Sequence, residues 1–159
     1  MSDMSSKPDQ IRNIAENRRA RREYDIQERL EVGLVLTGSE VKSLRGGTAN
    51  IAEGYIQFQD NEAWLVEAHI PQYPQAGPHN NHQPTRPRKL LMKAREIERW
   101  RRRVAEKGLS AMALQLYFKG SWVKLEIGLG RGRKLHDKRD LLRTRADKRE
   151  TERAIRRRE

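Results

Sequence analysis

The chain has 159 residues and no cysteine, and its 34 Lys and Arg against 22 Asp and Glu give a formal net charge of +12 and a sequence pI near 10.5. The missing cysteines exclude disulfides and thiolate zinc sites. No apolar run approaches the roughly 20 residues of a membrane span or forms a signal peptide, so a cytoplasmic protein without a membrane partner is expected. The cationic surplus favours a polyanionic partner, with nucleic acid first.

The N-terminal part is predicted to be a flexible end, a helix and a long strand. Residues 1–10 are polar and expected to fray. Ile11, Ile14 and Ala15 have helical spacing, and the segment 17–22 that follows holds four arginines. From Tyr24 to Leu36 every even position except one is apolar, which predicts a strand with one buried face that is too long to stay flat.

A short helix, a hairpin and a long loop come next. Thr37 and Glu40 have the spacing of a capping box, so a helix should begin at Thr37 and end in a left-handed conformation at Gly46-Gly47. Strands over 55–59 and 63–69 flank an Asp60-Asn61 turn. Residues 71–87 form a proline-rich loop, and loops of this length are usually functional.

The C-terminal part is predicted to be a helix, a second hairpin and a basic tail. Residues 94–107 are amphipathic and Gly108 follows them. Apolar residues alternate over 112–118 and 123–129, on either side of a turn at 119–121. Residues 131–159 hold thirteen Lys or Arg against six Asp or Glu and few apolar residues, so this tail is expected to be disordered alone and helical when bound.

These elements predict one mainly β domain over residues 11–130. An oligonucleotide-binding (OB) type β-barrel with flanking helices is the natural candidate, because it presents a curved sheet and loops to nucleic acid. The fold by itself confers no function.

No arrangement of residues predicts an enzyme, a metal site or a cofactor site. His79 and His82 lie in a loop without cysteine or a nearby carboxylate, so a polar loop that touches RNA is the simpler interpretation than zinc. The glycine-rich segment 128–134 lacks the GxxxxGK[ST] spacing of a phosphate loop. A His-Asp-Lys segment at 136–138 has groups that transfer protons, but adjacent residues in a flexible tail do not hold a catalytic geometry.

Four segments of the chain resemble the SsrA-binding protein (SmpB) family, and the resemblance spans Ala15 to about Ile155. They are the residues 17–21 ahead of Tyr24, the run 36–45, the segment 84–91 and the Asp-Lys-Arg at 137–139, all in the family's order. The second segment, Leu-Thr-Gly-Ser-Glu-Val-Lys-Ser-Leu-Arg, is the longest and most specific.

The resemblance implies an RNA-binding adaptor that binds the tRNA-like domain of transfer-messenger RNA and delivers it to the A site of stalled ribosomes for trans-translation. It implies a monomer without cofactor or metal, with the ribosome as a second partner and elongation factor Tu on the same RNA. The residues implied to lie at or support the RNA-binding face are Asn17, Arg18, Glu31, Lys42, Arg45, Arg86, Arg88, Lys89 and Leu91.

The same resemblance implies that the tail lies in the empty mRNA channel and reaches the decoding centre. Helix formation on binding would then sense that no message is present. Gly128, Gly130 and Gly132 are expected to provide a hinge. The residues implied at the channel and decoding centre are Gly132, His136, Asp137, Lys138, Arg139, Lys148 and Arg149.

The residues alone leave alternatives open. Arginine binds phosphate and stacks on bases, but a run such as Arg101–Arg103 can also be a solvated face. Glu31 lies on the polar side of the long strand, where it can accept from base or ribose donors or pair with a neighbouring arginine. A small basic rRNA-binding component of the ribosome would share the barrel and the basic arms, and a ribonuclease is the third and weakest alternative.

Overall fold

Seven antiparallel strands form the framework of the part of the chain that the structure describes, and six of them close into a barrel. The computed structural model describes residues 10–132. The ring runs β6-β3-β4-β5-β2-β7 and closes through the β6–β7 pairing, while β1 pairs with β6 outside it. The elements are β1 (Ile11–Glu16), α2 (Arg18–Glu23), β2 (Tyr24–Leu34), α3 (Gly38–Gly46), β3 (Tyr55–Gln59), β4 (Glu62–Val66), η2 (Pro74–Ala76), β5 (Arg88–Leu91), α4 (Ala94–Lys107), β6 (Ser110–Lys119) and β7 (Trp122–Gly132).

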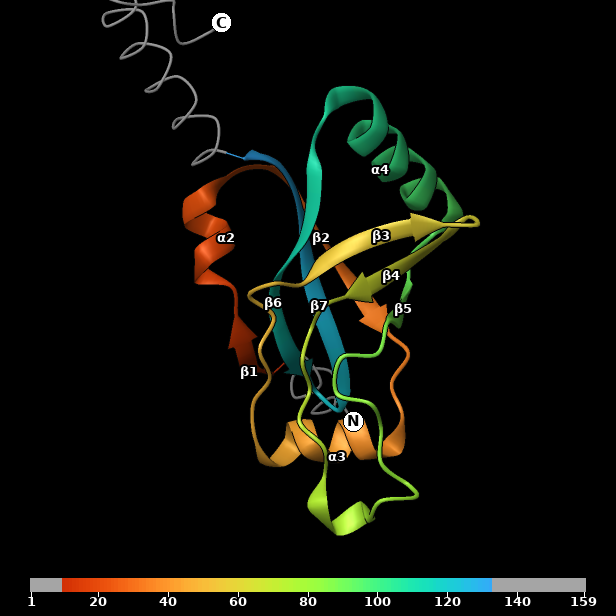
Figure 1. Cartoon of the computed structure of the whole chain (residues 1–159). Helices are drawn as coiled ribbons and strands as arrows, with labels where there is room; N and C mark the ends of the chain where they lie inside the picture. Colours follow the sequence, from red (N-terminus) through yellow and green to blue (C-terminus); the bar gives the residue numbers. More distant parts are fainter. Residues whose placement is uncertain (1–9, 133–159) are drawn as a thin grey trace, which may run out of the picture.

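The helices lie around the barrel at three places. Figure 1 shows α3 below one end, α4 at the opposite end and α2 beside the strands. The mainly β barrel with flanking helices is therefore confirmed. The predicted order and disorder of the tail beyond Gly132 fall outside the described residues.

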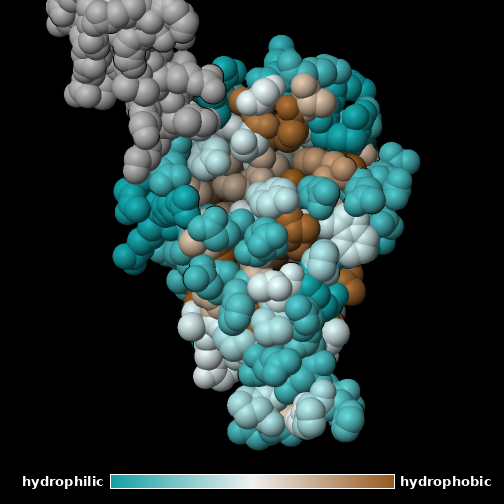
Figure 2. Space-filling view, in the orientation of Figure 1, coloured by the Kyte–Doolittle hydropathy of each residue, from teal (hydrophilic) through white to brown (hydrophobic). Residues whose placement is uncertain are grey.

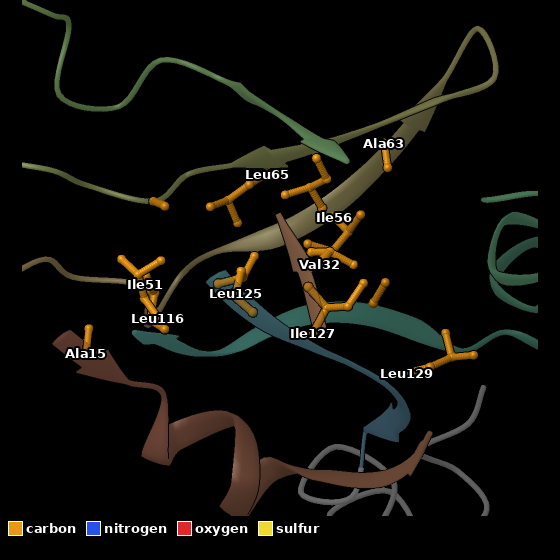
Figure 3. Close-up of a cluster of buried hydrophobic side chains, with 14 of the residues drawn as sticks. Ala15, Val32, Ile51, Ile56, Ala63, Leu65, Leu116, Leu125, Ile127 and Leu129 are labelled. Carbon is orange, nitrogen blue, oxygen red and sulfur yellow. The ribbon is translucent and has the colours of Figure 1, made fainter. Parts of the chain in front are cut away.

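Aliphatic side chains fill the barrel. Leu65, Leu116, Leu125 and Ile127 are each at most 1% exposed and belong to one continuous core, which Figure 3 shows between the strands. In β7 the odd residues from Leu125 to Leu129 point inward and the even residues Lys124 and Glu126 point outward. Because a close-packed core fixes the strands, the outward side chains stand on a rigid support.

The long strand predicted over 24–36 is confirmed as β2. Its odd residues from Asp25 to Glu31 are exposed and its even residues are at least partly buried. A bulge between Ile26 and Glu28 bends it, which lets one strand pair with β7 along most of its length and with β5 at its end.

The helix predicted from Ile11 is wrong, because these residues form β1. The far half of β6 has an edge that β3 leaves unpaired, and Ile11–Glu16 fills it. A bulge between Asn13 and Ala15 lets the consecutive residues Ile14 and Ala15 both be buried. Tertiary pairing thus overrides a local spacing that suits a helix.

Two predicted details of the first half need correction. Gly46 and Gly47 do not adopt a left-handed conformation; the chain leaves α3 extended, with Gly47 at φ −152°. The strand predicted over 63–69 ends at Val66, because Glu67 has φ +62° and breaks the ladder. The capping box at Thr37 and the Asp60-Asn61 turn are confirmed.

The glycine hinge predicted near the tail is wrong for Gly128 and Gly130, which lie within β7. A Cβ on Gly130 would lie 2.4 Å from the carbonyl oxygen of Asp25, and one on Gly128 would lie 2.6 Å from Leu114. These glycines allow β2 and β7 to approach closely. Gly132 is the last residue of β7 and pairs with Tyr24.

Candidate nucleic-acid interface

A buried carboxylate joins α3 to the loop and strand that follow residue 71. Glu40 is completely buried and accepts from two arginines: Arg86 at 2.8 Å on both oxygens, and Arg88 at 2.8 Å on Oε2. Arg88 is also completely buried, and its remaining nitrogens donate to the carbonyl oxygens of Ala68 and Pro84. Glu40 Oε1 accepts in addition from the Thr37 backbone N–H, which completes the capping box.

The charges of this cluster stabilise one another. Burial alone would raise the pKa of Glu40, but hydrogen bonds from Arg86, from the Thr37 backbone and from Arg88 outweigh it and hold that pKa below its ordinary value. Burial lowers the pKa of Arg88, and Glu40 opposes that effect. Both groups therefore remain ionised near neutral pH. Arg86 is 30% exposed, so it is the cation of this cluster that water reaches.

The long loop over 71–87 is held against α3 by side chains of its own, and Figure 1 shows it running beside that helix. His82 is buried; its Nε2 donates to the Ile70 carbonyl at 2.9 Å, which leaves Nδ1 to accept from Ser39 Oγ at 2.8 Å. Ser43 donates to the Pro71 carbonyl at 2.6 Å. His82 is thus a structural residue in the free protein, and the expectation that this histidine lies on a loop surface that touches RNA is corrected.

Asn17 is buried and holds the arginine-rich α2 on the barrel. Its side chain accepts from the Ala20 backbone N–H as the helix N-cap, and it donates to the carbonyls of Ala113 and Ile51 at 2.8 and 3.2 Å. Only 2% of Asn17 is exposed. Its neighbour Arg18 is 81% exposed in its side chain, 3.5 Å from Glu16. Asn17 therefore supports the surface that Arg18 presents.

Glu31 is paired within the protein. It accepts from the Tyr117 hydroxyl at 2.5 Å and lies 3.3 Å from Lys119 Nζ, both on β6 across the intervening β7. The Tyr117 hydrogen bond is the main cause of a lowered pKa at Glu31, and burial together with Glu31 raises the pKa of Tyr117. The cation that pairs with Glu31 is Lys119 and not an arginine. Glu31 thus orients the side chains of Tyr117 and Lys119 on the outer face of the sheet.

The strand β5 presents Lys89 and Leu91 next to the end of β2. Leu91 is 58% exposed, and its side chain covers Gly33, where a Cβ would lie 3.2 Å from Leu91 Cδ1. Lys89 is partly exposed and pairs with Glu62 at 3.1 Å. An exposed leucine beside a lysine on a flat strand pair suits contact with a ribose or a base face.

The structure separates the predicted RNA-face residues into an exposed and a buried set. Lys42 and Arg45 are exposed on α3, as Arg18 is on α2. Asn17 and Arg88 lie beneath the surface. Lys42 and Arg45 lie on α3 and Arg86 contacts it, Lys89 and Leu91 lie on β5, Glu31 lies on β2, and Asn17 and Arg18 lie at α2. Of the predicted channel residues only Gly132 is described; His136, Asp137, Lys138, Arg139, Lys148 and Arg149 fall outside the described residues.

The arginine run on α4 is largely neutralised by acids. Arg101 and Arg102 pair with Glu98 at 2.7 and 2.9 Å, and Arg103 pairs with Glu28 at 2.9 Å. Arg99 also pairs with Glu28. The interpretation of this run as a solvated face is the one that the structure supports.

A groove opens between α2, α4 and the strands β3 and β6. Its volume is about 570 Å³, and apolar residues such as Phe58, Val104 and Met112 line it together with Arg19 and Arg101. Figure 2 shows hydrophobic surface between α4 and the strands beneath it, with hydrophilic surface around it. Sequence patterns did not predict this groove, because its lining comes from four separate elements.

Sequence reasoning found Glu40 as a capping residue but missed its ion pairs. Arg86 and Arg88 lie in the segment 84–91 that the sequence singled out, but they are 46 and 48 positions from Glu40, so no local pattern predicts the contact.

Within residues 10–132, no cluster of three or more His, Cys, Asp or Glu is placed to hold a metal ion. No helix in that range is long and apolar enough to cross a bilayer.

The fold and this surface define a small β-barrel with cationic, partly apolar outer strands. The chain matches the family model described as SmpB protein over residues 14–157, and it belongs to this family. It is 48% identical over 154 residues to an SsrA-binding protein of Microcystis aeruginosa, covering 97% of this chain and 100% of the relative. It is 49% identical over 147 residues to an SsrA-binding protein of a Roseiflexus species, covering 92% and 93%.

A solved structure is also similar to this one. It is described as "tmRNA-SmpB: a journey to the center of the bacterial ribosome", has 39% sequence identity and a TM-score of 0.63, and the match covers 76% of this chain and 85% of that chain.

Proposed function

We propose that this chain is an RNA-binding adaptor that binds the tRNA-like domain of transfer-messenger RNA and brings it to the A site of stalled ribosomes for trans-translation. The observation that carries the proposal is near full-length similarity, at 48–49% identity, to proteins named for SsrA binding. The description of the similar solved structure, which names tmRNA, SmpB and the ribosome, supports the same function. In this role the chain acts as a binding protein without catalysis or cofactor.

The geometry supports a division of labour among the candidate residues. Exposed cations and Leu91 contact the RNA: Arg18, Lys42, Arg45, Arg86, Lys89 and Leu91. Asn17 and Arg88 are buried and hold α2, α3 and the long loop in place. Glu31 orients Tyr117 and Lys119. Arginine and lysine neutralise phosphates, so binding should weaken as salt rises.

The tail carries the second half of the proposal. Gly132 and the residues beyond it, which carry half of the net positive charge, enter the mRNA channel and reach the decoding centre. The chain acts as a cytoplasmic monomer, and elongation factor Tu joins the complex through the same RNA.

Two measurements on the untagged protein test this function. The RNA that copurifies with it is expected to be transfer-messenger RNA. A variant that ends after Gly132 keeps β7 whole, so it should bind a transcribed tRNA-like domain with nearly unchanged affinity while tagging of stalled peptides in a reconstituted translation system is lost. Loss of RNA binding on this truncation would contradict the division between barrel and tail.

The same preparation separates the alternatives. An rRNA-binding structural component would instead copurify with rRNA and remain on ribosomal subunits through high salt. A ribonuclease would cleave the RNA, and the cleavage would survive repurification and vanish with His136→Ala.

A further inference from the structure

An exposed tryptophan lies at the β6–β7 turn, on the outward side of the barrel. Trp122 is 72% exposed, more than any other large hydrophobic side chain within residues 10–132. It is an even residue of β7 and therefore points outward with Lys124, while Val123 and Leu125 belong to the core side. Placing an indole in water is unfavourable, so a fixed tryptophan in this position indicates a ligand.

The neighbours of Trp122 are cations and apolar side chains. The strand register places Trp122 opposite Lys119, and Lys119 opposite Ile11 of β1, so the three form one row across β7, β6 and β1. Ile11 is 56% exposed. The next row holds Lys124, Gly33 and Leu91, which joins Trp122 to the exposed leucine of β5. An indole, a leucine and lysines thus share one outer face.

The same turn borders a shallow hollow that reaches α3. Figure 1 shows the turn and α3 at one end of the barrel. The hollow measures about 360 Å³ and is lined by Arg12, Arg45, Phe118, Gln10 and the turn residues Gly120 and Ser121. The Arg12 guanidinium lies 4.9 Å from the centre of the Phe118 ring and donates to the Arg45 carbonyl at 3.3 Å. Arg12 is therefore fixed near this turn, but on the face of the sheet that Phe118 shares and opposite to that of Trp122.

We propose that Trp122 is a stacking site for an unpaired base of the bound RNA, with Lys119 and Lys124, which share its face of the sheet, on the adjacent phosphates. The inference rests on the proposed function and adds a subsite to it. Proteins bind unpaired bases by placing an aromatic side chain beside cations, since every base has a face that stacks and every phosphate a charge. The cations around Trp122 favour RNA over a protein or a second copy of this chain.

The test compares Trp122→Ala with Trp122→Phe in binding to a transcribed tRNA-like domain of transfer-messenger RNA. The alanine variant should bind about 5- to 150-fold more weakly, and the phenylalanine variant should recover most of that loss. Stacking releases no counterions, so Trp122→Ala should leave the slope of log affinity against log salt unchanged. Lys124→Ala should instead reduce that slope by roughly 0.7 to 0.9.

Fluorescence supplies a second readout. RNA should quench the exposed Trp122 in the wild-type chain, and Trp122→Phe should remove that share of the quenching. Trp100 is completely buried, so any quenching that remains in the variant comes from Trp64, which is partly exposed opposite Lys89. The urea midpoint of each variant shows that folding is intact.

The outcomes separate the two proposals. If the wild-type chain does not prefer the tRNA-like domain over polyuridine, the proposed function fails and the subsite fails with it. If the wild-type chain binds but Trp122→Ala binds equally well, only the stacking site is overturned. If the wild-type chain forms a dimer, and Trp122→Ala dissociates it without changing RNA affinity, the stacking site is also overturned. Trp122 would then be a protein contact.

Discussion

Glu40 on α3 and Glu98 on α4 accept hydrogen bonds of nearly the same length from two arginines each. The distances are 2.8 Å at Glu40 and 2.7 to 3.2 Å at Glu98. Their surroundings differ, since the Glu40 side chain is completely buried and the Glu98 side chain is 43% exposed. Burial, rather than hydrogen-bond length, decides how much the protein depends on each cluster.

The difference also divides the arginines by role. The Glu40 cluster joins α3, which carries Lys42 and Arg45, to the long loop and to β5, which carries Lys89 and Leu91. The Glu98 cluster joins residues of one helix three and four positions apart and connects no second element. A count of arginines treats the two clusters alike, although only the first organises a surface.

The largest effect is expected from Glu40→Gln. The substitution keeps the shape of the side chain but leaves Arg88 buried without a counter-charge, and breaking one partner of a buried ion pair costs about 3–5 kcal/mol. Urea denaturation should show the loss of unfolding free energy.

Two arginine variants provide the control for Glu40→Gln. Arg88 is completely buried and Arg86 is 30% exposed, so Arg88→Gln should destabilise more than Arg86→Gln although both arginines bind the same carboxylate. Equal losses from the two variants would show that burial does not set the energy of this cluster.

Asn17→Ala tests whether the same contrast holds for uncharged groups. The substitution removes the N-cap of α2 and leaves the buried carbonyls of Ala113 and Ile51 without their donor, so a loss of about 2–4 kcal/mol is expected. Thr37→Ala is the matched control, because it removes an exposed N-cap and should cost about 1 kcal/mol. A larger loss from Thr37→Ala in the same urea titration would refute this ranking.

How far the sequence predicted these clusters depends on how local each signal is. The alternation over 24–36 and the capping box at Thr37 involve neighbours in the chain, and the structure confirms both. The β1 segment was mispredicted because its conformation is decided by an open edge of β6 more than a hundred positions away.

The candidate site follows the same rule. Motifs brought Asn17, Glu31 and Arg88 to attention as residues at or supporting the RNA face. No sequence pattern distinguishes an arginine that lies on the surface from one, such as Arg88, that is completely buried. That distinction depends on how α3, the long loop and β5 pack around Glu40, and so it emerged only with the structure.

Protonating Glu40 with acid should reduce the unfolding free energy less than Glu40→Gln does. The pKa shift of Glu40 reflects only the difference between burial, which raises it, and the hydrogen bonds, which lower it. The pKa of Glu40 is lowered when the protein folds, so the unfolded chain binds more protons between the folded pKa and the ordinary value of about 4.3. The stability from this group is therefore present above that ordinary value and is lost as the pH falls through the folded pKa. Unfolding free energies across this window should fall less steeply for Glu40→Gln than for the wild-type chain, and parallel curves would contradict the assignment.

Tyr117→Phe tests a cluster of intermediate exposure. The hydroxyl donates to Glu31, whose side chain is 36% exposed, so water can replace much of the lost hydrogen bond and a loss of about 1 kcal/mol is expected. The pKa of Glu31 should rise toward its ordinary value in this variant, because the Tyr117 hydrogen bond is the main cause of its lowering. Carboxyl titration by NMR measures that change, and a Glu31 pKa that stays low would assign the effect to Lys119 instead.

The smallest effect is expected from Glu98→Gln, although Glu98 accepts three hydrogen bonds from Arg101 and Arg102. Arg101 and Arg102 lower the pKa of Glu98, yet all three side chains reach water, which solvates each charge once its partner is gone. The urea midpoint of Glu98→Gln should therefore coincide with that of the wild-type chain, at low and at high salt. A clear loss of stability that disappears in high salt would show that the exposed ion pairs on α4 stabilise the protein. Glu98 and Glu40 would then differ only in how much stability each contributes.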